Sequence, residues 1–247
     1  MAPCAEILNS ALPDPEYEEL IKALGPQTLP TDLDIPTLRH VTNGRKAKAR
    51  EALGGPPPGL VEGDIEISVR DGSKILAYVY APSDRKETTL PIMIFFHGGG
   101  FCIGSRHDDM DSNRSIAIQA GIVVVSIEYR LAPEHPFPQA VHDGLDALNW
   151  IAKNASIIRP NASASAGLIV NGTSAGGNIA NAVVYLNREQ EVPVRITGQL
   201  LSVAPLIPLP FIPDKYKDEY VSHVQNKAVT IPPPELSRLF LGGRAAT

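Results

Sequence analysis

The sequence predicts an α/β fold, a mostly parallel, doubly wound sheet that begins with antiparallel strands. The first observation is a series of short, continuous apolar runs, which are typical of strands covered on both faces. They are IMIFF (92–96), IVVVSI (122–127), LIVN (168–171) and QLLSVA (199–204). The second is that helix-patterned segments separate successive runs, at 109–120, 138–153 and 175–190. This alternation favours parallel strands joined by helices.

Two helical segments are expected before the sheet. Residues 14–25 (DPEYEELIKALG) carry apolar residues at helical spacing, with Asp14 as the cap and Pro15 in the first helical position. Residues 45–53 continue as a basic helical stretch, which GGPPPG (54–59) ends as a stiff linker. We therefore expect an N-terminal helical region with its Pro/Gly linker over 1–59 and a core domain over 60–247.

The core domain is predicted to begin with a hairpin. Apolar and polar residues alternate in VEGDIEISVR (61–70), and a second strand-like stretch follows in KILAYVYAP (74–82). Asp71-Gly72 lies between them, and Asp-Gly is a strong signal for a hairpin turn. These two strands are the antiparallel start of the sheet.

Composition narrows the class of protein. The 247 residues suffice for one sizeable domain, and the net charge of −5 argues against nucleic-acid binding, which needs a basic surface. Cys4 and Cys102 lie far apart, and residues 1–20 lack the basic and apolar parts of a signal peptide. No apolar run reaches the roughly 20 residues of a membrane span. We expect a cytoplasmic protein without a disulfide framework or a membrane span.

The hexapeptide GTSAGG (172–177) joins a strand-like run to a helical pattern. It matches G-x-S-x-G, in which a serine on a sharp strand-to-helix turn acts as a nucleophile. Glycines fit such a turn because larger residues would collide with the adjacent strand and helix. Ser174 is therefore the candidate nucleophile. The alternative is a glycine-rich helix start in which Ser174 is a simple cap.

A second glycine-rich segment, FFHGGGFCIGS (95–105), follows directly from the run at 92–96. Three successive glycines leave backbone N–H groups uncovered, so these groups can donate to an oxyanion. Together with the N–H of Ala175, the segment predicts an oxyanion hole built from two parts of the chain. The alternative is a phosphate-binding loop. It is disfavoured because no G-K-[ST] follows and the spacing of Gly98, Gly100 and Gly104 is not G-x-G-x-x-G.

Three motifs occur in one order: HGGGF (97–101), YRLAPEHPFP (129–138) and GTSAGGN (172–178). With them the chain resembles the hormone-sensitive-lipase-like branch of the α/β-hydrolases, a group of carboxylesterases and lipases, over about residues 60–205. The sequence is most similar to those of fungal members, among them esterases of secondary-metabolite pathways.

The resemblance implies an α/β-hydrolase sheet that hydrolyses short- to medium-chain acyl or aryl esters of small molecules, without a cofactor or a metal ion. Ser174 would be the nucleophile by this resemblance. The oxyanion hole would consist of His97, Gly98, Gly99, Gly100 and Ala175. The N-terminal region and residues 206–247 would form a cap over the acyl pocket.

Two departures from the family pattern stand out. Thr173 stands where many members have Asp, a position that the motif leaves variable. More seriously, the family places an Asp loop about 90–100 residues after the serine and a His loop beyond it. Only 73 residues follow Ser174, and neither loop signature is among them. The sequence thus predicts a C-terminally truncated hydrolase, whose last strand, QLLSVA, is an uncovered apolar edge.

Other residues could be considered for the missing roles. The histidines are His40, His97, His107, His135, His142 and His223. His223 with Asp214 or Asp218 meets the order Ser, Asp, His, but the polar segment around it is typical of a solvated surface. For His97, His135 and His142 a structural role is favoured. His107 with Asp108, Asp109 and Asp111 could hold a metal ion, although carboxylates capping a helix are the favoured interpretation.

Two further hypotheses follow from the missing acid and base. The chain could be a non-catalytic ligand-binding protein on the hydrolase scaffold, as plant gibberellin receptors are. It could also be a degenerate gene product that does not fold stably alone. The serine turn and the glycine segment favour the hydrolase.

Overall fold

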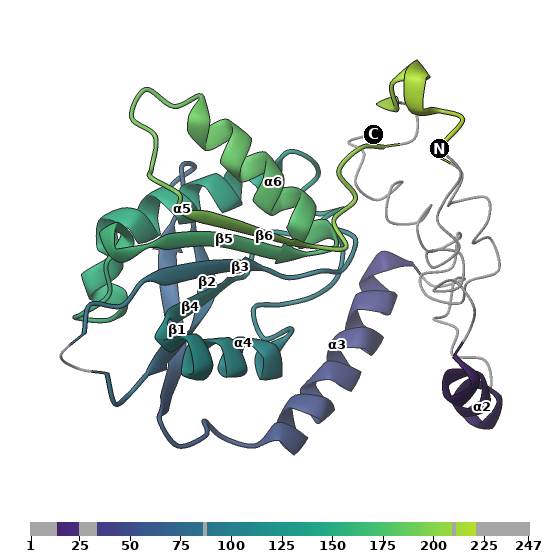
Figure 1. Cartoon of the computed structure of the whole chain (residues 1–247), viewed down its shortest axis with the longest axis horizontal. Coiled ribbons are helices and arrows are strands. Elements are labelled where there is room, and N and C mark those ends of the chain that lie inside the picture. Colours follow the sequence, from purple (N-terminus) through teal and green to yellow (C-terminus); the bar gives the residue numbers. More distant parts are fainter. Residues whose placement is uncertain (1–13, 25–33, 86–87, 209–210, 221–247) are drawn as a thin grey trace.

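Six strands form a sheet in the order β1-β2-β4-β3-β5-β6 within the described part of the chain, which comprises residues 14–24, 34–85, 88–208 and 211–220 (Figure 1). In this computed structural model the strands are β1 (Leu60–Ser68), β2 (Lys74–Pro82), β3 (Ile92–Phe96), β4 (Val123–Ile127), β5 (Leu168–Thr173) and β6 (Gly198–Ser202). β1 and β2 pair antiparallel, as do β2 and β4, whereas β4, β3, β5 and β6 are mutually parallel. The predicted α/β class with an antiparallel start is confirmed.

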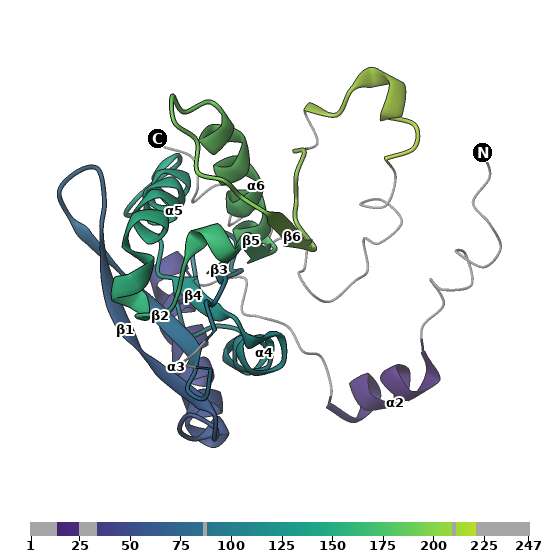
Figure 2. The ribbon, with the colours of Figure 1, turned by 60° about the vertical axis from the view of Figure 1, so that its left-hand side comes forward.

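Helices cover both faces of this sheet (Figures 1 and 2). α5 (Gln139–Ile158) and α6 (Ala175–Arg188) lie on one face. α4 (Met110–Ile116), which continues as a π-helical turn over Ala117–Gly121, lies on the other face, and α3 (Ile35–Leu53) lies beside it. α2 (Pro15–Leu24) starts after Asp14, whose carboxylate accepts a hydrogen bond from the backbone N–H of Glu16 at 2.8 Å, as expected of a cap.

The continuous apolar runs are explained by two cores, one on each face of the sheet. Along β3, Ile92, Ile94 and Phe96 join the core against α5 and α6, whereas Met93 and Phe95 join the core against α4. Each side chain buried in this way contributes about 1.5–3 kcal/mol relative to exposure. The parallel strands therefore need apolar residues at every position, which removes the alternation that marks a half-exposed strand.

Strand register brings the two glycine-containing motifs together. Phe96 at the end of β3 lies opposite Gly172 in β5, and both strands run in the same direction. The segment after β3 and the turn after β5 therefore leave the sheet at neighbouring points along one edge. Ligands bind at this carboxyl edge in open α/β sheets, so the topology defines where a site can form.

Helix α3 begins ten residues before the predicted basic stretch at 45–53. Asp34 caps it by accepting a hydrogen bond from the N–H of Thr37 at 2.8 Å, and Pro36 stands in the first turn. The helix buries Ile35 and Leu38 at its N-terminal end, and Ile35 packs with Cys102 and Ile103. The apolar face is short, so helical periodicity gave little signal there.

The sheet ends at β6 in the described part of the chain, where β6 pairs with β5 alone. Leu200 on this strand and Val203 just after it are 51% and 82% exposed. The expected apolar edge is present among the described residues. Cys4, His223 and most of the predicted cap-like segment at 206–247 lie outside them. Within the described ranges, no helix combines the length and apolarity needed to span a bilayer.

Candidate active site

Ser174 stands at a strained turn between β5 and α6. Its backbone angles are φ 54° and ψ −117°, a region that non-glycine residues rarely occupy. The N–H of Ser174 donates to the carbonyl of Ser202 at 2.8 Å, which fixes the turn against the end of β6. The side chain makes no capping hydrogen bond, so the interpretation of Ser174 as a simple helix cap is wrong.

The neighbouring glycines allow this turn to form. A Cβ on Gly172 would lie 2.2 Å from the carbonyl oxygen of Gly176, and a Cβ on Gly176 would lie 2.0 Å from the carbonyl oxygen of Phe96. Both contacts involve backbone atoms that a side-chain rotation cannot relieve. The ends of β3 and β5 and the start of α6 therefore approach closely only because these two residues lack a side chain.

The glycine segment lies directly against the serine turn. An ideal Cβ on Gly98 would be 3.6 Å from Cβ of Ser174 and 3.2 Å from the carbonyl oxygen of Thr173. Gly99 and Gly100 both have positive φ, and the carbonyl of Gly99 accepts hydrogen bonds from the N–H groups of Cys102 and Ile103. The segment thus curls back on itself, and side-chain-free backbone faces Ser174.

Ala175 is the first residue of α6. The helix's own hydrogen bonding starts where the N–H of Asn178 donates to the carbonyl of Ser174 at 3.0 Å. The N–H groups of the first turn, including that of Ala175, precede this bond, and they carry the partial positive charge of the helix N-terminus. These N–H groups and the glycine segment are thus available on two sides of Ser174.

His97 is fully buried behind the glycine segment. Its ring stacks on Tyr129 with centroids 4.2 Å apart, and the Tyr129 hydroxyl donates to the carbonyl oxygen of His97 at 2.8 Å. Burial lowers the pKa of His97, so the imidazole is neutral at physiological pH. Gly104 has to be glycine here, because its Cβ would lie 2.3 Å from Nδ1 of His97 at a φ of +107°. This contact explains the fourth glycine of the segment.

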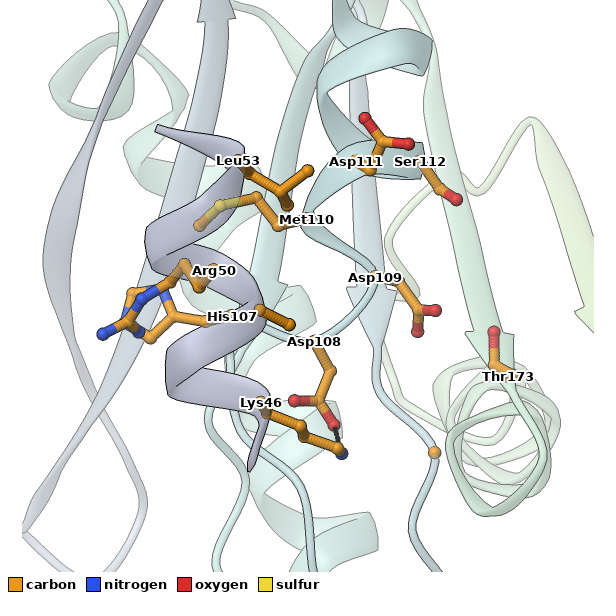
Figure 3. Close-up of a pocket in the computed structure, with 12 residues that line it drawn as sticks. Lys46, Arg50, Leu53, His107, Asp108, Asp109, Met110, Asp111, Ser112 and Thr173 are labelled. Carbon is orange, nitrogen blue, oxygen red and sulfur yellow. Dashed lines mark hydrogen bonds and ion pairs between the residues drawn. The ribbon is translucent and has the colours of Figure 1, made fainter. Parts of the chain in front are cut away.

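A cavity of about 500 Å³ opens between α3 and the segment that precedes α4 (Figure 3). Its lining residues are Lys46, Ala49, Arg50, Leu53, Gly98, His107, Asp108, Asp109, Met110, Asp111, Ser112 and Thr173. Because Gly98 and Thr173 both border Ser174, the cavity reaches the serine turn. Lys46 of α3 forms an ion pair with Asp108 in this cavity.

The predicted acidic cap of α4 takes a different form. Asp109 occupies the N-cap position with φ 55°, but its side chain makes no capping hydrogen bond. Partial burial of its carboxyl, and then the nearby Asp108, raise the pKa of Asp109. His107 instead packs its ring edge-on against Tyr78, with centroids 4.6 Å apart. The carboxylates of this run therefore pair or face the cavity and do not cap the helix.

No described residue hydrogen-bonds to the Ser174 hydroxyl. His40 and His135 are exposed and His142 lies on α5, while His223 falls outside the described ranges. Asp214, one proposed member of a substitute triad, is 93% exposed and pairs with Lys217 at 2.5 Å. Asp218 is exposed as well. The described residues thus contain the serine turn and its N–H donors, without a histidine in contact with the serine.

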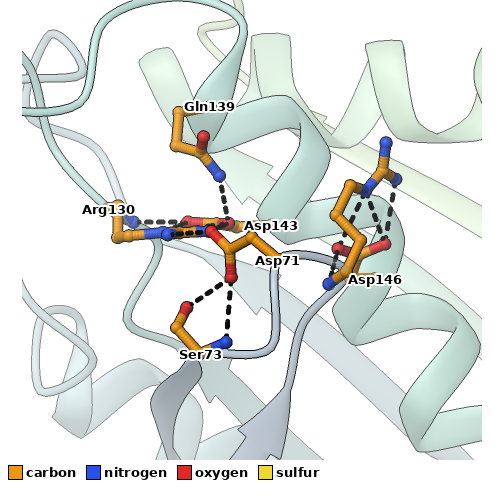
Figure 4. Close-up of polar contacts among 7 residues, drawn as sticks. Asp71, Ser73, Arg130, Gln139, Asp143 and Asp146 are labelled. Atoms are coloured by element: carbon orange, nitrogen blue, oxygen red, sulfur yellow. Dashed lines mark hydrogen bonds and ion pairs between the residues drawn. The ribbon is translucent and has the colours of Figure 1, made fainter.

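Sequence reasoning missed two sets of polar contacts in the YRLAPEHPFP segment. Arg39 of α3 reaches the segment and binds Glu134 with two hydrogen bonds of 2.8 and 2.9 Å. Arg130 forms an ion pair at 2.6 Å with Asp143, which is fully buried in α5 (Figure 4). The segment showed no obvious chemistry because its side chains hold neighbouring elements in place. Charged residues at 71 and 146 lie near Arg130 and Asp143, and neither gives a clear functional signal in the sequence.

Known proteins share the fold of this chain and are similar to it in sequence. A family model described as "alpha/beta hydrolase fold" matches residues 93–236. A carboxylesterase of Mycobacterium tuberculosis is 36% identical over 58% of this chain and 45% of its own length, and the versiconal hemiacetal acetate esterase of Aspergillus parasiticus is 30% identical over 72% and 53%. An esterase structure from Pyrobaculum calidifontis superposes with a TM-score of 0.78 at 30% identity, covering 95% of this chain and 71% of that one.

The matches show the family of this chain and how much of its relatives' length it spans. The chain spans 45% to 66% of the length of the first curated relatives that it matches. The family model covers more than half of the chain. The chain therefore belongs to the α/β-hydrolases, in the hormone-sensitive-lipase-like branch.

Proposed function

We propose that this α/β-hydrolase is a carboxylic-ester hydrolase that acts on short- to medium-chain acyl or aryl esters, with Ser174 as the nucleophile. The observation that carries the proposal is the strained conformation of Ser174, φ 54° and ψ −117°, directly beside Gly98. Such strain persists only where the surrounding structure enforces it, and it recurs at functional sites. Esterase names among the relatives support the same reaction class.

The reaction follows from the groups on either side of Ser174. The serine oxygen attacks the ester carbonyl carbon, and the carbonyl oxygen becomes an oxyanion. That oxyanion accepts hydrogen bonds from the N–H of Ala175 and from the backbone of Gly98 to Gly100, with His97 supporting the segment from behind. Each such donor is worth roughly 10²–10³ in kcat in comparable sites. A base takes the serine proton and returns it to the leaving oxygen as the C–O bond breaks, so the alcohol departs; water then adds to the acyl carbon, which releases the acid and restores the serine hydroxyl.

Activation of Ser174 requires a base. Since no described residue hydrogen-bonds to the hydroxyl, the base and its acidic partner would come from outside the described ranges. The imidazole of His97 does not fill this role, because it is fully buried against Tyr129.

The relatives suggest a setting for the activity. One of them is named for hydrolysis of versiconal hemiacetal acetate in Aspergillus parasiticus. By analogy, small acyl esters of secondary metabolites are the substrate class that we favour.

Two assays test the proposal on the same preparation. p-Nitrophenyl butyrate should be hydrolysed, and a fluorophosphonate probe should label Ser174, which peptide mass spectrometry locates. Ser174→Ala should abolish labelling and lower the hydrolysis rate by more than about 10³-fold. Ser115→Ala, an exposed serine on α4, is the matched control and should retain both. Full hydrolysis by Ser174→Ala would overturn the assignment.

A non-catalytic ligand-binding role is the second candidate. The unpartnered Ser174 hydroxyl among the described residues favours it. Slow or absent fluorophosphonate labelling, combined with saturable binding of p-nitrophenyl butyrate without hydrolysis, would support this role. Rapid labelling would exclude it, because it requires an activated serine.

A further inference from the structure

The cavity between α3 and the segment before α4 is the part of the site that would contact a substrate beyond its ester group. It is about 500 Å³ in volume and is bordered by Gly98 and Thr173. An ideal Cβ on Gly98 lies 3.6 Å from Cβ of Ser174, so a group in the cavity is attached close to the reacting carbonyl. The chemistry of the cavity wall therefore bears on which esters fit.

Two carboxylates in this wall, those of Asp109 and Asp111, have no partner among the described residues, and Asp109 is the one on the side of Thr173. Asp108 is paired with Lys46 and also accepts from Ser105, whereas the side chain of Asp109 makes no described hydrogen bond or ion pair. Figure 3 shows the Asp109 carboxylate on the side of the cavity where Thr173 lies, away from Lys46 and Arg50 on α3. Asp109 as a residue is exposed, and it lines the cavity.

The backbone holds this carboxylate in place. Asp109 has φ 55° and ψ 29°, and its carbonyl accepts the N–H of Asn113 at 2.9 Å, which fixes the residue at the start of α4. Met110, the next residue, is buried in the core against β2, β3 and β4. The carboxylate is thus anchored on a packed element, as a selective contact requires.

The charged side chains of the cavity wall discriminate between the chemical groups that could enter the cavity. An alkyl chain placed against Asp109 would remove water from a carboxylate without replacing its hydrogen bonds, which is unfavourable. A substrate carboxylate on the Thr173 side of the cavity would be repelled by Asp109, whereas the cations of the lining, Lys46 and Arg50, lie on α3. A hydroxyl or an ammonium group would instead donate a hydrogen bond to Asp109.

We propose that Asp109 is a specificity-determining residue, which selects esters that carry a hydrogen-bond donor, a hydroxyl or an ammonium group, within a few atoms of the ester carbonyl. This inference rests on the proposed ester hydrolysis and names the substrate class of the same site. It predicts that esters of plain alkyl groups are the poorer substrates.

Four esters of similar size test it by pH-stat measurement of kcat/KM. Propyl butyrate is the reference. 2-Hydroxyethyl butyrate and propyl 3-hydroxybutyrate place a hydroxyl on the alcohol and acyl sides, and 2-(dimethylamino)ethyl butyrate supplies an ammonium group. At least one donor-bearing ester should exceed propyl butyrate by roughly tenfold, the factor that a hydrogen bond to a charged group provides. The donor-bearing ester with the largest kcat/KM relative to propyl butyrate identifies the preferred donor and whether it belongs on the alcohol or the acyl side.

Two variants connect the preference to Asp109. Asp109→Asn keeps the size and tolerates the left-handed backbone, and Asp109→Gly removes the side chain at a φ that glycine accepts. Both should reduce the donor-to-propyl ratio roughly tenfold, with the larger loss for glycine. Asp218→Asn, an exposed carboxylate outside the cavity, should leave the ratio as it is in the parent. A ratio that Asp109→Gly does not change would overturn the inference.

A binding measurement separates this inference from the reaction itself. N-(2-Hydroxyethyl)butyramide, N-propylbutyramide and N-[2-(dimethylamino)ethyl]butyramide resist hydrolysis and are compared by saturation-transfer NMR. If no ester is hydrolysed yet a donor-bearing amide binds tighter in an Asp109-dependent manner, the proposed function fails and the specificity inference stands. Equal binding of all three amides would contradict the inference whether or not esters are hydrolysed.

Discussion

The guanidinium of Arg39 donates a hydrogen bond from Nε to the carbonyl oxygen of Cys102, 2.7 Å away. From the same group, Nη2 donates to the carbonyl of Ala132 at 2.7 Å. Cys102 belongs to the glycine segment beside Ser174, and the N–H of Ala132 donates to the carbonyl of Phe101 in that segment. One side chain of α3 thus holds the two loops that shape the candidate oxyanion hole.

Replacing this side chain should destabilise the protein. Arg39→Met keeps most of the length but leaves two carbonyls without their charged donor, so the free energy of unfolding should fall by about 2–3 kcal/mol. Urea denaturation followed by circular dichroism measures it. Arg188→Met, at a 69% exposed arginine that contacts only the exposed neighbours Glu189 and Tyr185 among the described residues, should change stability by less than about 0.5 kcal/mol. Similar losses for both variants would contradict a special role for Arg39.

The serine turn predicts a sharp difference between two glycines. Gly176→Ala places a Cβ 2.0 Å from the carbonyl oxygen of Phe96, so the backbone has to shift and stability should fall by about 3 kcal/mol or more. Gly63→Ala in β1 adds a Cβ with nothing within 4 Å and should change stability by less than about 1 kcal/mol. Thermal unfolding of both variants provides the comparison. A Gly176→Ala protein as stable as the parent would mean that the turn is packed less closely.

The buried pair of Arg130 and Asp143 predicts an asymmetric cost (Figure 4). Asp143 is fully buried and accepts hydrogen bonds from Arg130 and from Gln139, so Asp143→Ala removes the buried partner of the arginine, which keeps its ion pair with the more exposed Asp71. The expected loss is about 3–5 kcal/mol in urea denaturation. The double variant Asp143→Leu with Arg130→Met should recover a large part of it, because no buried charge remains and Asp71, which also loses Arg130, is 44% exposed. No recovery would indicate that packing, and not charge, sets the cost.

Acid stability should depend on Asp71. Hydrogen bonds from Ser73, followed by the one from Arg130, lower the pKa of this carboxyl below its usual range. A folded-state pKa below the unfolded value of about 3.9 stabilises the protein above that pH, and the contribution is lost as the pH falls toward the folded pKa. The melting temperature should therefore drop less between pH 5 and pH 2 in Asp71→Asn than in the parent. Asp218→Asn serves as the exposed control, and an equal drop in all three proteins would exclude this role.

The sequence by itself determined the elements whose signals are local. The apolar runs predicted β3, β4 and β5 because their side chains meet a core on both faces, and β6 was predicted from an apolar run that stays largely exposed. Asp71-Gly72 predicted the hairpin because glycine supplies the φ of +84° found there. The turn at Ser174 was predictable from its motif, and the requirement for Gly172 is local because its Cβ would meet the backbone of Gly176, whereas Gly176 is required by the distant backbone of Phe96. The first half of α3 was missed because its buried face is short and its partners lie in distant loops.

Only the tertiary structure decided how distant side chains meet. Arg39 and Cys102 are 63 residues apart, Arg39 and Ala132 are 93 apart, and His97 and Tyr129 are 32 apart. Arginine, aspartate and tyrosine occur throughout the chain, so no local pattern marks which of them become partners. The position of the unpartnered Asp109 carboxylate was likewise not predictable from the sequence, because its place in the cavity depends on α3 packing beside α4. Backbone geometry is dictated by neighbours in sequence, whereas side-chain pairing is dictated by strand order and register.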